Sequence, residues 1–382
     1  MNILQINASY KPAYIYGGPT MSVAQLSEQL VKNDCNVQVF TTTANGPREL
    51  EIATTAAQQV NDVAVSYFPR LSKDHSHFSP RLLFKLWKEV RSFDLVHIHA
   101  WWNLVSILSC AIAHLRKVPV ILSPRGTLSP YSFVTNHTGI KLLFHRFIGK
   151  FLLNRCHLHS TSEREQAALK KLLKPKSIFN IHNLVSLPSQ IPAPASENGL
   201  LRLLFLSRIE QKKGIELLFA ALADLTIPYQ LTIAGSGNAA YIAKLKTLSH
   251  QYHIEQHIRW LGFKSDDKFE LIAQHHILVL PSYDENFGNV VIESLCVGTA
   301  VLISNEVGLA SFVAENNMGW ICETNSESIK NKLLHIYSHP GKLIIIREFA
   351  PMLIISAFND QKLIQSYLNM YQKVSRRATT HD

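Results

Sequence analysis

Glu285 and Glu293, two carboxylates with seven residues between them, are the clearest candidates for chemistry in this sequence. Glu285 precedes a predicted helix and Glu293 lies one turn inside it, so the two side chains should not touch. A carboxylate on an otherwise apolar helix is costly to bury unless it is paired or bound to a ligand. Two glutamates at this spacing are also common on solvated surfaces. The strand, turn and helix around the two glutamates favour the other interpretation, in which each carboxylate binds a different part of one ligand.

A strand, a turn and a helix are predicted around these carboxylates. Residues 277–280 form a short apolar run typical of a buried strand, and residues 290–296 have the pattern of a buried helix. The turn between them is Asn286-Phe287-Gly288-Asn289, with Asn289 as the predicted N-cap. Backbone N–H groups at a helix start lack internal partners and attract anions, so the turn is predicted to bind phosphates.

Two cations form a second candidate group. Arg208 follows the strand predicted at residues 201–206, and Lys213 directly precedes the helix predicted at residues 215–223. Both can face a helix start and bind phosphate oxygens. An ordinary basic turn would have the same composition.

Three loops of the first half also follow predicted strands. Gly17 and Gly18 let the backbone approach a ligand with no side chain in the way, although such a pair is also a generic turn. His99 ends a strand, where open α/β sheets bind ligands, while His97 on the same strand is predicted to be structural. Arg125 follows the next strand; its guanidinium stays protonated, so it can bind an anion but cannot act as a base.

Two of these motifs resemble a known family. The segment from Glu285 to Glu293, followed by residues 297–301 (Val-Gly-Thr-Ala-Val), resembles the E-x7-E signature of retaining family 4 glycosyltransferases. The spacing from Arg208 to Lys213, followed by Gly214, resembles the motif with which that family grips a diphosphate. Many members carry a His where this chain has Arg125, and the Ser-Pro-Arg-Gly version is similar to enzymes that build bacterial surface polysaccharides and lipopolysaccharide.

The resemblance implies roles for these residues. The donor would be a UDP-, GDP- or ADP-sugar, with Glu285 on the sugar hydroxyls and Glu293 on the ribose. The expected catalytic residues are Glu285, His99 and Arg125. The expected donor-binding residues are Gly17, Gly18, Arg208, Lys213, Glu285, Asn286, Phe287, Gly288, Asn289 and Glu293. No D-x-D sequence occurs in the chain, so neither a metal nor a separate cofactor is expected.

The family's architecture is an α/β fold called GT-B, in which two Rossmann-like domains face each other across a cleft. Here it implies an acceptor-side domain at residues 1–185 and a nucleotide-sugar domain at residues 200–357. Residues 186–199 are rich in Pro, Ser and Ala and form the predicted linker. A last helix, residues 358–375, is expected to return to the first domain.

Composition limits the compartment and the kinds of site. The 382 residues are 47% hydrophobic and 17% charged, which is typical of a globular protein with more than one domain. The five cysteines are scattered without a C-x-x-C pair, which argues against a disulfide framework or a zinc site and favours a reducing cytoplasm. The start lacks the features of a signal peptide, and the apolar run at residues 104–113 is too short to cross a bilayer. We expect a soluble or peripheral cytoplasmic protein.

The net charge of +10 lies in the first half of the chain. Residues 1–190 hold 21 Lys and Arg against 10 Asp and Glu, a balance of +11, and residues 191–382 hold 17 against 18, a balance of −1. We therefore expect the basic half to bind an anionic membrane surface, at the inner face of the membrane. The other expected partner is a glycan or lipid-linked glycan acceptor. The candidate surfaces are two basic-apolar helices predicted at residues 81–90 and 141–153.

Other classes of protein fit the sequence less well. A glycoside hydrolase, or a phosphorylase on a similar scaffold, would also use paired carboxylates, but a hydrolase needs no clamp for a diphosphate such as Arg208 and Lys213. A non-catalytic nucleic-acid-binding protein would explain the basic half. No nucleic-acid-binding module is recognisable, so we expect no nucleic acid partner.

Overall fold

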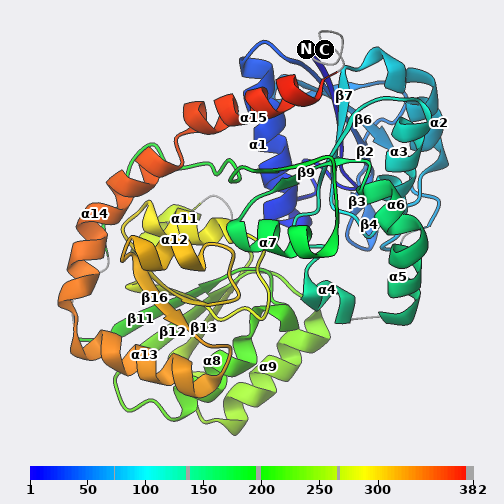
Figure 1. The fold of residues 1–382 in the computed structure, drawn as a ribbon. Coiled ribbons are helices and arrows are strands. Elements are labelled where there is room, and N and C mark those ends of the chain that lie inside the picture. Colours follow the sequence, from blue (N-terminus) through cyan, green and yellow to red (C-terminus); the bar gives the residue numbers. More distant parts are fainter. Residues whose placement is uncertain (73, 135–137, 195–198, 265–266, 376–382) are drawn as a thin grey trace. The chain divides into compact units, whose positions relative to one another are not determined.

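Two α/β units make up the chain in a computed structural model (Figure 1). Unit 1 contains Met1–Leu184 and the chain from Asp360 onward, and unit 2 contains Val185–Asn359. The structure describes residues 1–72, 74–134, 138–194, 199–264 and 267–375. Part of the predicted linker, residues 195–198, lies outside the described residues, and residues 186–194 contain neither helix nor strand. None of the described helices combines the length and apolar character that crossing a bilayer requires.

The sheet of unit 1 is parallel except for one edge strand. Its order is β10-β9-β8-β7-β1-β2-β6-β5, and β5 pairs antiparallel to β6. The strands are β1 (Asn2–Ile6), β2 (Asn36–Thr42), β5 (Gln58–Val60), β6 (Val63–Phe68), β7 (Leu95–His99), β8 (Val120–Ser123), β9 (His157–Ser160) and β10 (Ser177–Asn180). Parallel strands place their carboxyl ends at one edge, where His99 and the loop with Arg125 lie.

Helices connect most of the parallel strands of this unit, and one further helix, α15, follows unit 2 in the chain. They are α1 (Gly18–Lys32), α2 (Pro80–Glu89), α3 (Leu104–Leu115), α4 (Pro130–Val134), α5 (Thr138–Phe144), α6 (Lys150–Leu153), α7 (Glu163–Leu172) and α15 (Asp360–Val374). An apolar cluster from α2, α3, α6 and α7 packs on the strands, with Leu86, Val105 and Leu153 completely buried. Figure 1 shows α1 and α15 beside each other in the same unit, and the two helices are in contact.

The last helix, α15, belongs to unit 1 through specific hydrogen bonds. Tyr371 is completely buried, and its hydroxyl accepts from Gln5 Nε2 at 3.1 Å and contacts His97 Nδ1 at 2.7 Å. The Tyr367 hydroxyl donates to the carbonyl of His182 at 3.1 Å. These bonds join the last helix to strands of the first half of the chain.

Unit 2 is built on a wholly parallel sheet of six described strands. Its order is β13-β12-β11-β14-β15-β16. The strands are β11 (Leu201–Leu206), β12 (Tyr229–Ala234), β13 (Ile258–Gly262), β14 (Ile277–Leu280), β15 (Ala300–Ser304) and β16 (Gly319–Cys322). The helices are α8 (Ile215–Ala223), α9 (Ala239–Gln251), α10 (Lys268–Ala273), α11 (Asn289–Leu295), α12 (Ala310–Glu315), α13 (Ser326–Ser338) and α14 (Gly341–Ala357). Here β11 and β14 are neighbours, so their carboxyl ends bring the two candidate motifs of this unit together.

Two segments of unit 1 depart from a simple alternation of strands and helices. Between β2 and β6 lie the hairpin of β3 (Ala44–Asn45) and β4 (Arg48–Glu49) and the short strand β5. The single helix expected at residues 141–153 is interrupted by a π turn at His145–Gly149. A Cβ at Gly149 would lie 3.1 Å from the His145 ring, so the absence of a side chain there lets the ring pack against the backbone.

Substitution of Gly214 can test the close packing between the segment after β11 and the segment after β14. It has φ +69°, and a Cβ there would lie 2.2 Å from the carbonyl oxygen of Pro281, directly after β14. Gly262 has the same φ of +69° with nothing within 4 Å of its Cβ position. We expect Gly262→Ala to cost about 1–2 kcal/mol of unfolding free energy through backbone strain alone. Gly214→Ala should cost about 1–3 kcal/mol more, because the methyl group must displace the end of β14. Urea titrations that give equal losses would contradict this packing.

Candidate active site

Two adjacent ion pairs join the segment that follows β11 to the segment that follows β14 in unit 2. Lys213 Nζ donates to Glu285 Oε2, and the two side chains are 9% and 20% exposed. Beside them Lys212 Nζ lies 2.8 Å from Asp284 Oδ2. The backbone N–H of Tyr283 donates to the carbonyl of Lys212 at 2.9 Å. Two consecutive lysines are therefore matched to two consecutive carboxylates.

The charge of Glu285 follows from this pairing. Burial would raise the pKa of its carboxyl group, but the charge of Lys213 and the hydrogen bond from it hold the pKa below its ordinary value. Lys212 and Arg208 act in the same direction. Glu285 is therefore a carboxylate at neutral pH and offers oxygen acceptors to hydroxyl groups.

The backbone of Glu285 is held from the other side by the loop after β15. Its N–H donates to the carbonyl of Glu306 at 3.0 Å, and its carbonyl accepts from the N–H of Gly308 at 2.8 Å. Two residues further on, Phe287 is 3% exposed and its ring packs edge-on against Phe358 at 6.2 Å. These contacts hold the backbone of Glu285 in place at the beginning of the turn that precedes α11.

The helix after the turn starts one residue differently from the prediction. The N-cap is Gly288, not Asn289, which is the first residue of α11. Gly288 has φ +93°, a left-handed conformation that disfavours side chains, and this explains why glycine takes the capping position. A Cβ there would also approach Val307 and Val291 at 3.2 and 3.3 Å.

Glu293 and Arg208 have partners of their own. Glu293 Oε1 accepts from Lys268 Nζ at 3.0 Å, a pair that links α11 to α10. Arg208 donates to Glu210 at 2.7 Å, and both side chains are about two-fifths exposed, at 42% and 40%. Glu285 and Glu293 are thus paired with different lysines, Lys213 and Lys268, which agrees with separate roles in binding a ligand.

In unit 1 the predicted residues meet at Arg125. Its Nη1 donates to Ser22 Oγ at 2.8 Å and to Asn183 Oδ1 at 3.1 Å, and its Nε donates to His99 Nδ1 at 3.2 Å. Ser22 lies in the first turns of α1, which begins at Gly18 with Gly17 as its N-cap. The guanidinium therefore joins the glycine loop, the end of β7 and the chain after β10.

His99 lies buried beside Arg125 at the end of β7. The ring is completely buried, with Nε2 2.7 Å from Gln5 Oε1 and Nδ1 accepting from Arg125. Burial lowers the pKa of His99 well below its ordinary value, with smaller effects from His97 and Arg125, so the ring is neutral. Both ring nitrogens have partners within unit 1, one of them Arg125, and the catalytic role of His99 stays a prediction.

A layer of buried polar side chains continues from His99 across the sheet. His97 contacts Tyr371 through Nδ1 and Ser123 Oγ through Nε2, each at 2.7 Å, which confirms its structural role. Ser123 Oγ also lies 2.6 Å from His159 Nδ1. The polar atoms of this layer are satisfied by one another, as burial requires.

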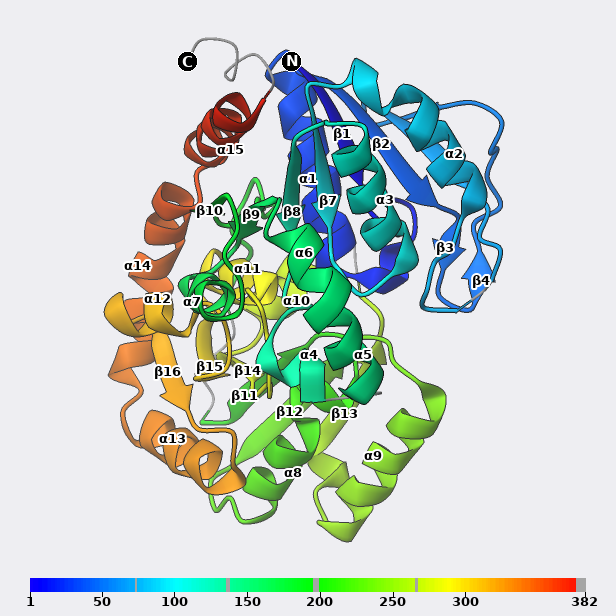
Figure 2. The same ribbon diagram turned by 45° about the vertical axis from the view of Figure 1, so that its right-hand side comes forward.

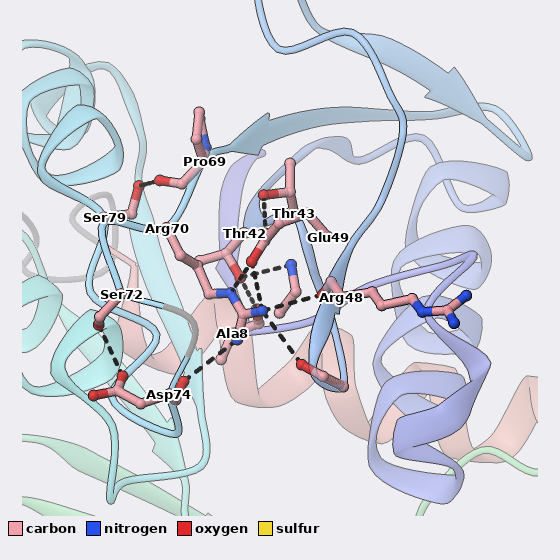
Figure 3. Close-up of polar contacts among 12 residues, drawn as sticks. Ala8, Thr42, Thr43, Arg48, Glu49, Pro69, Arg70, Ser72, Asp74 and Ser79 are labelled. Atoms are coloured by element: carbon pink, nitrogen blue, oxygen red, sulfur yellow. Dashed lines mark hydrogen bonds and ion pairs between the residues drawn. The ribbon is translucent and has the colours of Figure 1, made fainter.

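A third polar network supports the glycine loop (Figure 3). Arg70, whose side chain is 1% exposed, donates through Nε to Glu49 Oε1 at 2.8 Å and through Nη2 to the carbonyl of Gly46 at 3.3 Å. The N–H of Gly46 donates to the Tyr16 hydroxyl at 3.0 Å. Tyr16 directly precedes Gly17, so the hairpin of β3 and β4 holds the segment that leads into α1.

Several supporting residues escaped sequence reasoning. Asp284 and Lys212 each sit beside a recognised residue, and their matched charges were a usable signal. Lys268 and Asn183 come from distant segments that carry no motif, so only the fold reveals them. Glu165, in the first turn of α7 after its N-cap Ser162, belongs to no recognised motif, yet its carboxylate accepts from the N–H groups of Gly126 and Thr161 and holds the Arg125 loop.

These two parallel-sheet units, with a cation-carboxylate site at a helix start, define a GT-B glycosyltransferase. Residues 16–187 match the family model described as Glycosyltransferase Family 4, and residues 189–350 match the model described as Glycosyl transferases group 1. Together the two models span most of the chain, which confirms the predicted resemblance to family 4 glycosyltransferases and the predicted fold class.

Known proteins of this kind resemble the chain over nearly its full length. An uncharacterized glycosyltransferase of Methanocaldococcus jannaschii is 23% identical and covers 97% of this chain and 98% of its own. The gpi3 subunit of a Schizosaccharomyces pombe phosphatidylinositol N-acetylglucosaminyltransferase is 26% identical over 83% of this chain and 69% of its own.

Solved structures support the same architecture. Sucrose-phosphate synthase of Thermosynechococcus elongatus has a TM-score of 0.78 at 18% identity, covering 97% of this chain and 98% of its own. Anabaena HepE in complex with UDP-glucose has a TM-score of 0.75 at 18% identity, covering 98% and 100%. WaaG, a glycosyltransferase involved in lipopolysaccharide biosynthesis, has a TM-score of 0.70 at 14% identity, covering 97% and 99%.

The histidine layer predicts how unit 1 responds to acid. Burial lowers the pKa of His159 from 6.5 to about 3, although its hydrogen bond to the Ile181 carbonyl acts in the opposite direction. Below pH 6.5 the unfolded chain binds a proton that the folded chain does not, so stability falls by about 1.4 kcal/mol per pH unit for such a histidine. We expect His159→Gln to reduce the loss of unfolding free energy between pH 7.5 and pH 5.5 by about 1.4 kcal/mol. The exposed His75→Gln variant is the control; an identical pH dependence for the His159 variant would contradict a neutral buried ring.

Proposed function

We propose that the chain is a metal-independent retaining glycosyltransferase that moves a sugar from a nucleotide-diphosphate sugar to a glycan or lipid-linked glycan. The buried pair of Lys213 and Glu285, at the carboxyl edge of unit 2 beside the start of α11, is the observation that carries the proposal. It supplies an oriented carboxylate and a cation close to the start of this helix, where backbone N–H groups attract anions. HepE, whose structure contains UDP-glucose, and WaaG, from lipopolysaccharide biosynthesis, support a nucleotide-sugar donor and a role in surface polysaccharide synthesis.

Each residue of unit 2 has a distinct task in this reaction. Lys213, Arg208 and the N–H groups around Phe287, Gly288 and Asn289 hold the diphosphate. Negative charge grows on the diphosphate as it leaves, so these donors stabilise the transition state more than the ground state. Glu285 accepts from hydroxyls of the transferred sugar, and Glu293 accepts from the ribose. Asn286 belongs to the same turn.

Unit 1 is assigned to the acceptor. Gly17 and Gly18, which are proposed to contact the donor as well, leave backbone free of side chains at the start of α1, and Arg125 holds that turn through Ser22. Burial lowers the pKa of Arg125, but a guanidinium remains protonated at neutral pH. Arg125 therefore acts through charge and hydrogen bonds, and His99 acts as a positioning residue through its contact with Arg125 Nε.

The donor assignment is tested with Glu285 and Lys213. Purified chain is first screened against UDP-, GDP- and ADP-sugars for thermal stabilisation and hydrolysis, and transfer is then measured with the accepted donor. We expect Glu285→Gln and Lys213→Ala each to lower the rate at least about tenfold, because each removes a contact with the donor. Glu323→Gln, an exposed carboxylate that pairs with Asn305, is the matched control and should keep full activity. Near-full activity of a folded Glu285→Gln variant would overturn the assignment.

A peripheral position at the inner face of the membrane is the second part of the proposal. The helices α2 and α6 of unit 1, visible in Figure 2, and the π turn at His145–Gly149 present aromatic side chains to solvent. Phe84 is 62% exposed, Phe147 67% and Phe151 55%. Lys88 Nζ lies 4.3 Å from the centre of the Phe84 ring, and the Arg155 guanidinium lies 3.6 Å from that of Phe151. Mixed aromatic and basic side chains suit the interface of an anionic bilayer.

Liposome sedimentation tests this surface. Basic residues near an anionic bilayer contribute about 1 kcal/mol each, so we expect binding to anionic vesicles at low salt, release at high salt, and little binding to neutral vesicles. Charge reversal at Lys141, Arg146 and Lys150 should weaken binding without changing donor hydrolysis; the side chain of Lys141 lies outside the described set. Reversal at Lys170, Lys171 and Lys174, three exposed lysines on and after α7, makes the same change in charge elsewhere. Equal weakening by both triplets, or equal binding to both vesicles, would contradict the assigned surface.

A further inference from the structure

Three soft ligand atoms meet at one point of unit 1. Cys110 and His114 lie four residues apart on α3, which places them one turn apart on one side of the helix. Cys156 lies between α6 and β9 and is brought to the same point by the fold. Cys110 Sγ and Cys156 Sγ are 3.5 Å apart, Cys156 Sγ and His114 Nε2 are 3.5 Å apart, and all three atoms lie within 4.8 Å of one another.

These separations match the edges of a small coordination tetrahedron. Zinc bonds of about 2.3 Å to sulfur and about 2.0–2.1 Å to nitrogen, at tetrahedral angles, place neighbouring ligand atoms about 3.5–3.8 Å apart. A disulfide would instead need the two sulfur atoms to close to about 2.05 Å. The thiols therefore stand at a distance that suits a shared ion without further movement.

The surroundings favour a divalent soft cation. Both cysteines are completely buried in the apolar cluster of unit 1, where an unbalanced charge is costly. Two thiolates and one Zn²⁺ ion sum to zero charge, so the assembled centre is compatible with these apolar neighbours. Thiolate and imidazole ligands select zinc over magnesium and calcium, which prefer oxygen.

The place of this cluster in the fold separates it from the candidate active site. The helix α3 begins after the carboxyl end of β7 and ends before β8 begins, so Cys110 and His114 lie toward the amino edge of the sheet. Cys156 directly precedes the first residue of β9. Arg125 and His99 lie at the opposite, carboxyl edge. A metal here would join α3 to the segment after α6 and would not take part in sugar transfer.

We propose that Cys110, His114 and Cys156 bind one structural Zn²⁺ ion. His114 is only partly buried, which leaves an entry path and a fourth position for water; within the described part of the chain the cluster contains no further His, Cys, Asp or Glu. Binding converts two thiols to thiolates and releases their two protons to the buffer, with no change of oxidation state. This site is independent of the proposed transfer reaction.

Metal titration of the full chain tests the site. The reduced protein is freed of metal with a chelator and titrated with ZnCl₂ alone, and with CoCl₂ for its sulfur-to-cobalt absorption. We expect about one Zn²⁺ per chain and the release of about two protons per Zn²⁺ bound. His114→Gln should weaken binding at least about tenfold and Cys110→Ser with Cys156→Ser at least about a hundredfold, since each removes a ligand. Cys35→Ser, at a buried cysteine outside the cluster, is the control and should bind as the native chain does.

Two results would overturn the proposal. One is zinc binding that is equal in the native chain and in the double cysteine variant. The other is a native chain that, after reduction, takes up no Zn²⁺ or Co²⁺ at micromolar metal. If the double cysteine variant does not fold, the His114→Gln comparison decides, because this partly buried ring can be replaced without opening the core. None of these measurements uses a sugar donor, so the result does not depend on the transferase activity.

Discussion

The buried ion pair between Lys213 and Glu285 is the constraint on which unit 2 depends. Removing either partner would leave a largely buried charge without its counterion, which is costly in a protein interior. The pair is possible because β11 and β14 are neighbours in a parallel sheet, so the segments after them converge. Gly214 then allows the chain after Lys213 to pass within van der Waals distance of the Pro281 carbonyl. One electrostatic contact therefore requires a particular strand order and a residue without a side chain.

Unit 1 solves a different problem with neutral groups. Its buried polar layer of Gln5, His97, Ser123, His159 and Tyr371 is held together by hydrogen bonds in which each ring nitrogen has a partner. Neutral rings avoid the desolvation of charge that would accompany burial. The single cation at its carboxyl edge, Arg125, is held by a neutral histidine, a hydroxyl and an amide. None of these three partners of Arg125 is a carboxylate, so none of them neutralises its positive charge.

The sequence was sufficient for the fold class and for the residues that belong to motifs. Glu285 and Lys213 were found because each sits next to a strand end and a helix start, and both signals are local. Asn289 was assigned the wrong capping position because the φ of Gly288 depends on packing against Val307, which no local pattern encodes. The zinc ligands were missed for a similar reason. Cys110 and Cys156 are separated by 46 residues, and only the pairing of β7, β8 and β9 brings them together.

The membership of α15 in unit 1 has a consequence for biosynthesis. The residues that pack against His97 and Gln5 are translated after the whole of unit 2, so a nascent chain carries an incomplete first unit throughout synthesis of the second. During that interval the face that Tyr367 and Tyr371 later cover is open to water or to a chaperone. Unit 2 is continuous in sequence and can fold as soon as it leaves the ribosome, whereas unit 1 is completed last. Native packing of unit 1 around Gln5 and His97 therefore requires that α15 has been synthesised.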